Sequence, residues 1–300
     1  MAAHILAPLN DSPAAPLALR YAFLLADRLA GVVYVGGLTE KKEAGDTVVY
    51  VTPVRRPELA AIRSEYGNGY AHAEMRTLDM RATNVPIRAF VAEAGVSLVV
   101  MGTHERSALM RAVRGTLDDH VVRQLGVPVI LIHPRQSGRH IREHLQHVLI
   151  PLDGTPDAER AIDAVATIDP EFRLRYTLVE VVAEPARDTF GAAVSAQISN
   201  IEELHMRQET GAYLEGVADR LRARGARVET VVAVRDDTGR ALIQEIHHHD
   251  PDLIAMTTHS RGGWRHHEVG GVATGILHHT TTPVMLLNVS VSTPGLAGVP

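Results

Sequence analysis

Cysteine is absent from this chain of 300 residues. The absence excludes disulfide scaffolds, thiolate zinc sites, iron–sulfur clusters and cysteine nucleophiles. Aromatic residues are scarce, at 4%, which disfavours a base-stacking platform for single-stranded nucleic acid. The sequence also lacks the run of ~18 apolar residues that a membrane-spanning helix requires. Its first residues, MAAHILAPLNDS, do not have the pattern of a secretory signal. Together these absences predict a cytoplasmic protein.

The charge balance gives no sign of a polyanionic partner. Lys and Arg number 30 against 35 Asp and Glu, which leaves a formal charge of −5 and an isoelectric point near 6.4. A general nucleic-acid binder would show a basic face or stripe, so we expect neither nucleic acid nor a membrane as a partner. The hydrophobic fraction of 45% is ordinary for a globular protein, and the length predicts two domains.

The chain repeats itself in three places. HILAPLNDS at 4–12 is echoed by HVLIPLDGT at 147–155, and MGTHERSALMRAVRGT at 101–116 by MTTHSRGGWRHHEVGG at 256–271. The third echo is GVPVILI at 126–132 against TTPVMLL at 281–287. Such self-similarity predicts two tandem domains. We place them at 1–134 and 147–290, with a polar linker at 135–146 and a tail at 291–300.

Strands and helices alternate in the second copy. We predict strands at 148–152, 175–182, 226–234, 253–256 and 283–289, and helices at 156–168, 201–224, 239–248 and 271–280. The strands are apolar throughout rather than alternating, which is typical of a parallel sheet covered on both faces. The fold class is therefore α/β, with one open, Rossmann-like parallel sheet in each copy.

The first copy matches this pattern at both ends but not in the middle. We predict a helix at 17–29, a strand at 32–38, a long helix at 57–81 and a short helix after it. No third strand is evident, and TVVYVT at 47–52 is an extra β-like segment that could take its place.

The candidate ligand residues follow the first and fourth strands of each copy, because ligands of open parallel sheets bind at the carboxyl ends of the strands. Asn10 and Asp153 follow the two first strands, and loops that run into helix starts follow the fourth strands. Such a loop presents backbone N–H groups and a helix dipole to a phosphate. Neither the Walker A nor the G-x-G-x-x-G pattern is present, so a purely structural turn remains an alternative at this point.

The segments HILAPLNDS, VVMGTHERSALMRAVRGT and VPVILI resemble the universal stress protein family, and the whole chain is similar to its tandem two-domain form. The resemblance implies five-stranded α/β domains of the adenine-nucleotide alpha hydrolase-like type, packed as a pseudo-two-fold pair through their last strands, here 127–132 and 283–289. It also implies ATP or another adenine nucleotide, with Mg as a companion ion, and a regulatory role in the stress response. A whole-chain homodimer is a further expectation.

Neither copy keeps the family's nucleotide motif whole. That motif is an Asp after the first strand, then G-x-x-G, nine residues and G-[S/T]. In the first copy Asn10 replaces the Asp and Glu105 replaces the second glycine. In the second copy Thr257 and Ser260 replace the two loop glycines, and Gly271 replaces Ser/Thr.

The resemblance nevertheless implies a set of candidate nucleotide-binding residues. These are Asn10, Gly102, His104, Arg106, Gly115, Thr116, Asp153, Thr257, His259, Ser260, Arg261, Gly270 and Gly271. The two histidines recur at one repeat position, where they could contact phosphate or equally hold the loop by a hydrogen bond.

Other functions remain open on the sequence. The broken motifs favour, as the alternative, an interaction module that has lost its nucleotide. A slow ATPase would need Asp153 or Glu105 as its base, and no catalytic constellation is otherwise present. His140, His144 and His147 have the spacing of one helix face, but a solvated linker is the favoured interpretation, so we expect no metal site.

Overall fold

The computed structural model describes residues 3–78, 84–103, 117–134, 145–182, 192–235, 237–258 and 271–291. The chain is an α/β protein with a mostly parallel sheet, which confirms the predicted fold class. It forms two compact units. Unit 1 comprises Met1–His144, Thr257–Gly270 and Thr281–Pro300, and unit 2 comprises Leu145–Met256 and Gly271–Thr280. The linear domain boundaries given above stay a prediction.

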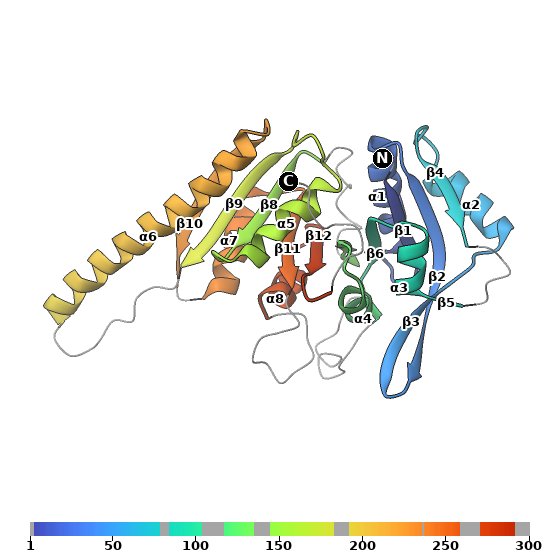
Figure 1. The fold of residues 1–300 in the computed structure, drawn as a ribbon, viewed down its shortest axis with the longest axis horizontal. Coiled ribbons are helices and arrows are strands. Elements are labelled where there is room, and N and C mark those ends of the chain that lie inside the picture. Colours follow the sequence, from blue (N-terminus) through green and yellow to red (C-terminus); the bar gives the residue numbers. More distant parts are fainter. Residues whose placement is uncertain are drawn as a thin grey trace. The chain divides into compact units, whose positions relative to one another are not determined.

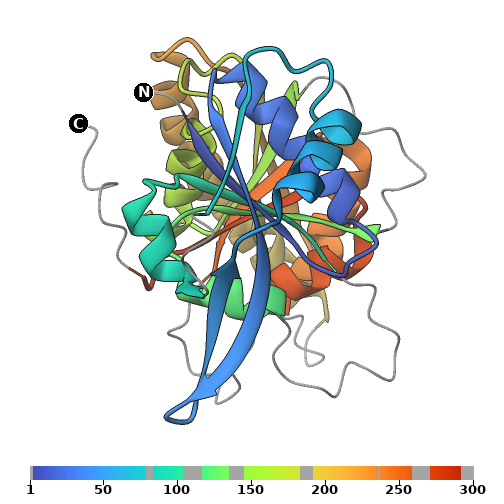
Figure 2. The ribbon, with the colours of Figure 1, turned by 90° about the vertical axis from the view of Figure 1, so that its right-hand side faces the viewer.

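Unit 1 has a mixed sheet with helices on both faces. Its strands are β1 (His4–Leu9), β2 (Val32–Glu43), β3 (Asp46–Thr52), β4 (Glu74–Thr77), β5 (Val85–Pro86), β6 (Leu98–Gly102), β7 (Val129–Ile132) and β12 (Val284–Asn288). Their order is β12-β7-β6-β1-β2-β3-β5, with β4 also paired to β2. The helices are α1 (Ala15–Arg28), α2 (Arg56–Tyr66), α3 (Ile87–Glu93) and α4 (Leu117–Gln124). In Figure 2, α1 and α2 cover one face and α3 and α4 the other.

The middle of unit 1 differs from the sequence prediction. The long helix expected at 57–81 is wrong, because α2 ends at Tyr66 and Glu74–Thr77 forms β4. Strand β4 pairs in parallel with β2 and is the third strand that the sequence did not reveal. The segment 47–52 is not its substitute, since β3 returns antiparallel to β2 as a hairpin. The sequence EMRT contains no apolar run, and only its register with β2 makes it a strand.

The β2–β3 hairpin extends beyond the rest of unit 1 and is held by α4 (Figure 2). The side-chain amide of Gln124 donates to the carbonyl of Thr47 at 2.7 Å and accepts from the amide of Val49 at 3.3 Å. It therefore occupies backbone groups on the outer edge of β3 as a neighbouring strand would. His120 Nδ1 lies 2.7 Å from Glu40 Oε1, a second link between α4 and the hairpin. Covering an exposed edge in this way blocks pairing with other chains.

Unit 2 has a wholly parallel sheet of order β10-β9-β8-β11. Its strands are β8 (His147–Leu152), β9 (Arg175–Val182), β10 (Arg227–Val234) and β11 (Leu253–Thr258). Its helices are α5 (Pro156–Ala166), α6 (Ala192–Arg222), α7 (Thr238–His249) and α8 (Gly271–His279). Every helix and strand predicted for the second copy is present, and the strand expected at 283–289 is β12, which belongs to unit 1. Only α6 differs appreciably, since it begins nine residues before the expected position 201 (Figure 1).

The strands of unit 2 are apolar because both faces of the sheet are covered. Val148, Leu149 and Ile150 of β8 are fully buried. Helices α7 and α8 contact each other, while α5 and α6 are joined by an ion pair between Glu159 and Arg220. The run of apolar residues therefore reflects burial on two sides, as the sequence predicts.

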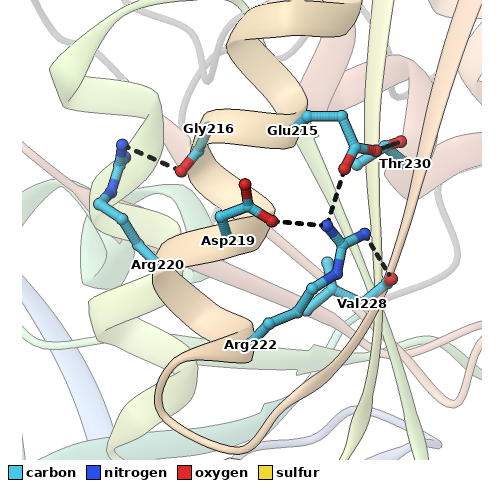
Figure 3. Close-up of polar contacts among 7 residues, drawn as sticks. All are labelled: Glu215, Gly216, Asp219, Arg220, Arg222, Val228 and Thr230. Atoms are coloured by element: carbon cyan, nitrogen blue, oxygen red, sulfur yellow. Dashed lines mark hydrogen bonds and ion pairs between the residues drawn. The ribbon is translucent and has the colours of Figure 1, made fainter.

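A polar network fixes the C-terminal part of α6 against β10 (Figure 3). Arg222 Nη1 lies 2.7 Å from Glu215 Oε2 and 2.9 Å from Asp219 Oδ1, and Nη2 donates to the carbonyl of Val228 at 3.1 Å. Thr230 of β10 donates to the other oxygen of Glu215. The Arg222 and Thr230 hydrogen bonds lower the pKa of Glu215. Helix α6 is thus fixed to the sheet edge over its last two turns.

The last strands of the two repeats pair with each other. Strand β12, from the end of the chain, is antiparallel to β7, with Val284 opposite Leu131 and Leu286 opposite Val129. The Asn288 side chain adds a hydrogen bond to the carbonyl of Arg123 at 3.0 Å. The expected contact between residues 127–132 and 283–289 is therefore present in unit 1, whereas the wider pseudo-two-fold packing stays a prediction. In the described part of the chain, no helix is both long and apolar enough to span a bilayer.

Candidate functional site

In unit 1 the structure brings Asn10 and Gly102 together. The Asn10 side-chain nitrogen donates to the Gly102 carbonyl at 2.7 Å, and the Ser12 hydroxyl donates to the carbonyl of Thr103. Ser12 Oγ in turn accepts from the amide of Ala14 at 3.0 Å, just before α1. These bonds join the loop after β1 to the end of β6. The Asn10 amide nitrogen and the Ser12 hydroxyl are therefore engaged within unit 1, whereas Asn10 Oδ1 is buried and has no hydrogen-bond partner among the described residues.

Gly102 is required at this junction for space. A Cβ on Gly102 would lie 2.7 Å from both the carbonyl carbon of Ala14 and the amide nitrogen of Ala15. Both are backbone atoms, which cannot rotate away as a flexible side chain could. The first glycine of the motif therefore has a packing reason that is independent of any phosphate.

The other first-copy candidates, His104, Arg106, Gly115 and Thr116, lie outside the described residues. Helix α4 begins directly after them, at Leu117. The predicted order of loop and helix start is thus consistent with the part of the chain that the structure describes.

In unit 2, Asp153 follows β8 with its side chain exposed at the carboxyl end of the strand. Its Oδ1 accepts from the amide of Thr155 at 3.0 Å and from the Thr155 hydroxyl at 2.6 Å. Gly154 between them has φ +77°, a conformation that glycine adopts without strain. Thr155 also caps α5 by accepting from Ala158 N at 3.2 Å. The turn orients the Asp153 carboxylate but engages only one of its oxygens among the described residues.

The rest of the second motif is only partly described. Gly271 begins α8 in unit 2, and Thr257 is the fifth residue of β11 and is grouped with unit 1. His259, Ser260, Arg261 and Gly270 lie outside the described residues. Strands β8 and β11 are parallel neighbours, so their carboxyl ends point to the same edge of the sheet, and α8 is the next described element along the chain after β11.

Glu180 is a site residue that the sequence analysis missed. It lies on β9 opposite Leu152, and a Cβ on Gly154 would be 3.9 Å from its Oε1. Its other oxygen, Oε2, is buried and has no hydrogen-bond partner within the described ranges. Burial, and then the negative charge of Asp153, raise the pKa of the Glu180 carboxyl. The available signal was one acidic residue inside the apolar strand RYTLVEVV.

Tyr213 of α6 approaches the same group. Burial and the nearby carboxylates of Glu159, Glu180 and Asp153 raise the pKa of the Tyr213 hydroxyl far above its ordinary value. The three carboxylates therefore lie within electrostatic range of the Tyr213 hydroxyl, which is buried. This corner of unit 2 is rich in hydrogen-bond acceptors and negative in charge.

The raised pKa of Glu180 predicts a pH-dependent stability. Because the folded-state pKa lies above the unfolded-state value, the folded chain binds more protons between the two values, and unit 2 gains stability as the pH falls through this window. Glu180→Gln removes the penalty of the buried charge. The variant should unfold at a modestly higher urea concentration than the wild type at neutral pH, and the difference should close as the pH falls to glutamate's ordinary pKa of ~4.3. Urea midpoints measured across this range test it; a difference independent of pH would contradict it.

The histidines do not form a metal centre within the described residues, where no group of three or more metal-binding side chains is present. His147 opens β8, so it does not share a helix face with His140 and His144, which lie outside the described residues. Its Nε2 lies 2.8 Å from Thr177 Oγ1, and its Nδ1 lies 2.9 Å from an Arg175 nitrogen. Both ring nitrogens are engaged, so His147 is a hydrogen-bonded core histidine.

Comparison with known proteins identifies related chains. The profile of the Universal stress protein family matches residues 1–133 and 144–288. Universal stress proteins of Mycobacterium tuberculosis and Mycobacterium bovis are 29% identical over 212 residues, which is 68% of this chain. The match spans 66% of their own length, just under two thirds.

Solved structures show the same fold. A universal stress protein of Archaeoglobus fulgidus aligns with a TM-score of 0.58 and 14% identity, over 96% of this chain and 97% of that one. A protein of unknown function from Pseudomonas aeruginosa aligns with a TM-score of 0.57 and 15% identity, over 95% and 92%. Both likenesses extend over the two repeats together.

Proposed function

Because the chain belongs to the universal stress protein family, we propose that it binds an adenine nucleotide, ATP or a relative, in unit 2. The regulatory role in a stress response that the family implies, and a location in the cytoplasm, are part of this proposal. The nucleotide would be a signal or a stored ligand rather than the substrate of a defined reaction.

The observation that carries the proposal is the contrast between Asp153 and Asn10. Asp153 presents an exposed carboxylate that the Asp153–Thr155 turn holds in place, with Oδ2 left for a ligand. A carboxylate in this position can accept hydrogen bonds from ribose hydroxyl groups. Asn10, its counterpart in the first repeat, instead donates to Gly102. Unit 2 is therefore the better candidate for the nucleotide.

The phosphate end of the ligand would face the start of α8. Gly271 is its first residue, and its backbone N–H is among the four that an α-helix leaves unpaired at its N-terminus. The helix dipole there attracts negative charge. The carboxylates on the β8 and β9 side repel phosphate, so the two ends of the site favour one orientation of the nucleotide. A Mg ion bound with ATP would neutralise part of the phosphate charge.

A second function is favoured for unit 1, which we propose is a structural and interaction unit. Asn10 and Ser12 are both bonded to carbonyls at the end of β6, where a ligand would otherwise bind. The outer edge of β7 is covered by β12. Under this interpretation unit 1 pairs the last strands of the two repeats and holds no nucleotide, and a whole-chain homodimer would have to use a surface other than the β7 edge.

The nucleotide proposal is tested by the molecules that copurify with the chain. We expect near-stoichiometric release of ATP, ADP or AMP on denaturation, at about one per chain, measured by mass spectrometry. Asp153→Asn preserves an oxygen acceptor but removes the charge, and we expect at least a tenfold loss of ATP affinity from one charge-assisted hydrogen bond.

Asn10→Asp is the matched control, because it restores the family's residue in unit 1. If unit 1 holds no nucleotide, this change leaves the affinity and the stoichiometry as they were. No released nucleotide, together with no binding at millimolar ATP, would sink the proposal and leave the interaction module as the function of both repeats.

A further inference from the structure

Glu180 Oε2 is a buried carboxylate oxygen without a hydrogen-bond partner among the described residues. An unsatisfied charged oxygen costs folding free energy, and an apolar residue like the valines on either side would avoid that cost. Position 180 therefore carries a carboxylate oxygen that forms no hydrogen bond within the described chain. A ligand that donates a hydrogen bond would satisfy it.

The same position in the first repeat carries no such group. Leu9 pairs with Gly37 in unit 1 as Leu152 pairs with Glu180 in unit 2, so Gly37 is the structural counterpart of Glu180. A Cβ on Gly37 would lie only 2.5 Å from Thr52 Oγ1, because the β2–β3 hairpin passes there. The unpaired carboxylate is thus a property of unit 2, the unit in which Asp153 also presents a carboxylate.

The hydrogen-bond acceptors around Glu180 favour the ribose and base of a nucleotide over its phosphates. Asp153 and Glu180 are both acceptors, and they lie close enough for their charges to interact. Phosphate groups are acceptors and anions, so they are repelled from this corner. Ribose hydroxyls and the exocyclic amino group of a base are donors, and they complement it.

The position along the sheet agrees with this assignment. Strand β9 lies on one side of β8, and β11, which leads towards α8, lies on the other. Adjacent strands are ~4.8 Å apart, so Glu180 is about 10 Å across the sheet from β11. A nucleotide with its phosphates at the start of α8 and its ribose at Asp153 extends in the direction of Glu180.

We infer that Glu180 is a specificity-determining residue of unit 2, whose Oε2 accepts a hydrogen bond from the exocyclic amino group of adenine. The inference rests on the proposed function and adds the group that selects the base. Hypoxanthine carries a carbonyl oxygen where adenine carries this amino group. A carboxylate and a carbonyl both accept hydrogen bonds and neither can donate one, so the site should bind inosine triphosphate more weakly than ATP.

The test compares ATP, inosine triphosphate and deoxy-ATP on the full chain freed of bound nucleotide, by isothermal titration calorimetry. We expect the wild type to prefer ATP over inosine triphosphate by about tenfold or more, as one hydrogen bond to a charged acceptor allows. Glu180→Gln has nearly the same shape, and its amide can turn to present either a donor or an acceptor. The preference should fall to within about threefold in this variant.

Glu159→Gln is the matched control. It removes a carboxylate near Tyr213 that is already paired with Arg220, so it should leave the base preference unchanged. Glu180→Ala provides a second variant, in which ATP affinity falls and the affinity for inosine triphosphate does not.

Three results would overturn the inference while the proposed function stands. The wild type could bind both triphosphates equally, Glu180→Gln could keep the wild-type preference, or it could change the ratio of ATP to deoxy-ATP instead, which would assign Glu180 to the ribose. Failure of the proposed function is distinct, because the wild type would then bind none of the three nucleotides.

Discussion

Asp169→Ala is expected to destabilise unit 2 by about 4 kcal/mol, because one buried carboxylate organises the turn between α5 and β9. Asp169 is 2% exposed. Its Oδ1 accepts from the amide of Arg173 at 3.1 Å, and its Oδ2 accepts from the amide of Leu174 at 2.9 Å and from the Tyr176 hydroxyl at 2.8 Å. Alanine would leave three donors unsatisfied, two of them on the backbone.

The loop between these donors increases the dependence on Asp169. Phe172 lies within it at φ +52°, in the left-handed region that non-glycine residues seldom adopt. The Asp169 hydrogen bonds over-determine this turn and offset the strain. Without them the turn should relax, and the first residues of β9 should lose their register with β8.

Urea unfolding followed by hydrogen exchange of the β8 and β9 amides measures the effect in unit 2 alone. Tyr176→Phe is the matched variant, because it removes one of the three hydrogen bonds and should cost only about 1 kcal/mol. A loss of similar size in both variants would mean that the carboxylate does not organise the turn.

Gly102→Ala is expected to destabilise unit 1 by about 2–3 kcal/mol, because its single added carbon would overlap the backbone. The new Cβ would lie 2.7 Å from atoms of Ala14 and Ala15, so either α1 or β6 must shift. The shift would also stretch the hydrogen bonds from Asn10 and Ser12, which join the loop before α1 to Gly102 and Thr103 at the end of β6.

Gly211→Ala is the control with the opposite sign. Gly211 lies inside α6, and a Cβ there would meet nothing within 4 Å. Alanine should stabilise that helix by about 0.5–1 kcal/mol, because it has the higher helix propensity. Thermal unfolding with local hydrogen exchange distinguishes the two variants.

The Gly102 result also bears on function. A packing glycine predicts that folded Gly102→Ala protein keeps the nucleotide bound in unit 2. If the variant keeps full stability but loses its nucleotide, Gly102 serves a phosphate and the assignment of unit 1 as a nucleotide-free unit is wrong.

The sequence predicts the helices and strands that local patterns of apolar residues determine, and it misses those that form only by pairing with a distant part of the chain. Strand β9 was predicted with its observed bounds, because eight consecutive residues form one continuous, mostly apolar run. Strand β4 was missed, because EMRT has no such run and becomes a strand only beside β2. The prediction of a long helix across this segment was wrong for the same reason. Helical spacing of apolar residues does not show where the backbone will instead pair with a distant strand.

The candidate site divides in the same way. Asp153 and its turn could be predicted, because HVLIPLDGT carries the strand, the turn and the helix cap within nine residues. Glu180 could not be assigned to the site, because it lies 27 positions further along the chain. Only the β8–β9 register places it beside Asp153 and Gly154.

The sequence by itself therefore determined the duplication, the alternation of strand and helix, the family and the position of Asp153, because each is written in local patterns of apolar residues and turns. The tertiary structure decided which polar groups are engaged. It joined Asn10 to Gly102, left Glu180 Oε2 buried beside Asp153, and paired β12 with β7. These outcomes depend on atoms far apart in the chain coming within hydrogen-bond distance, and strand order and register set those distances.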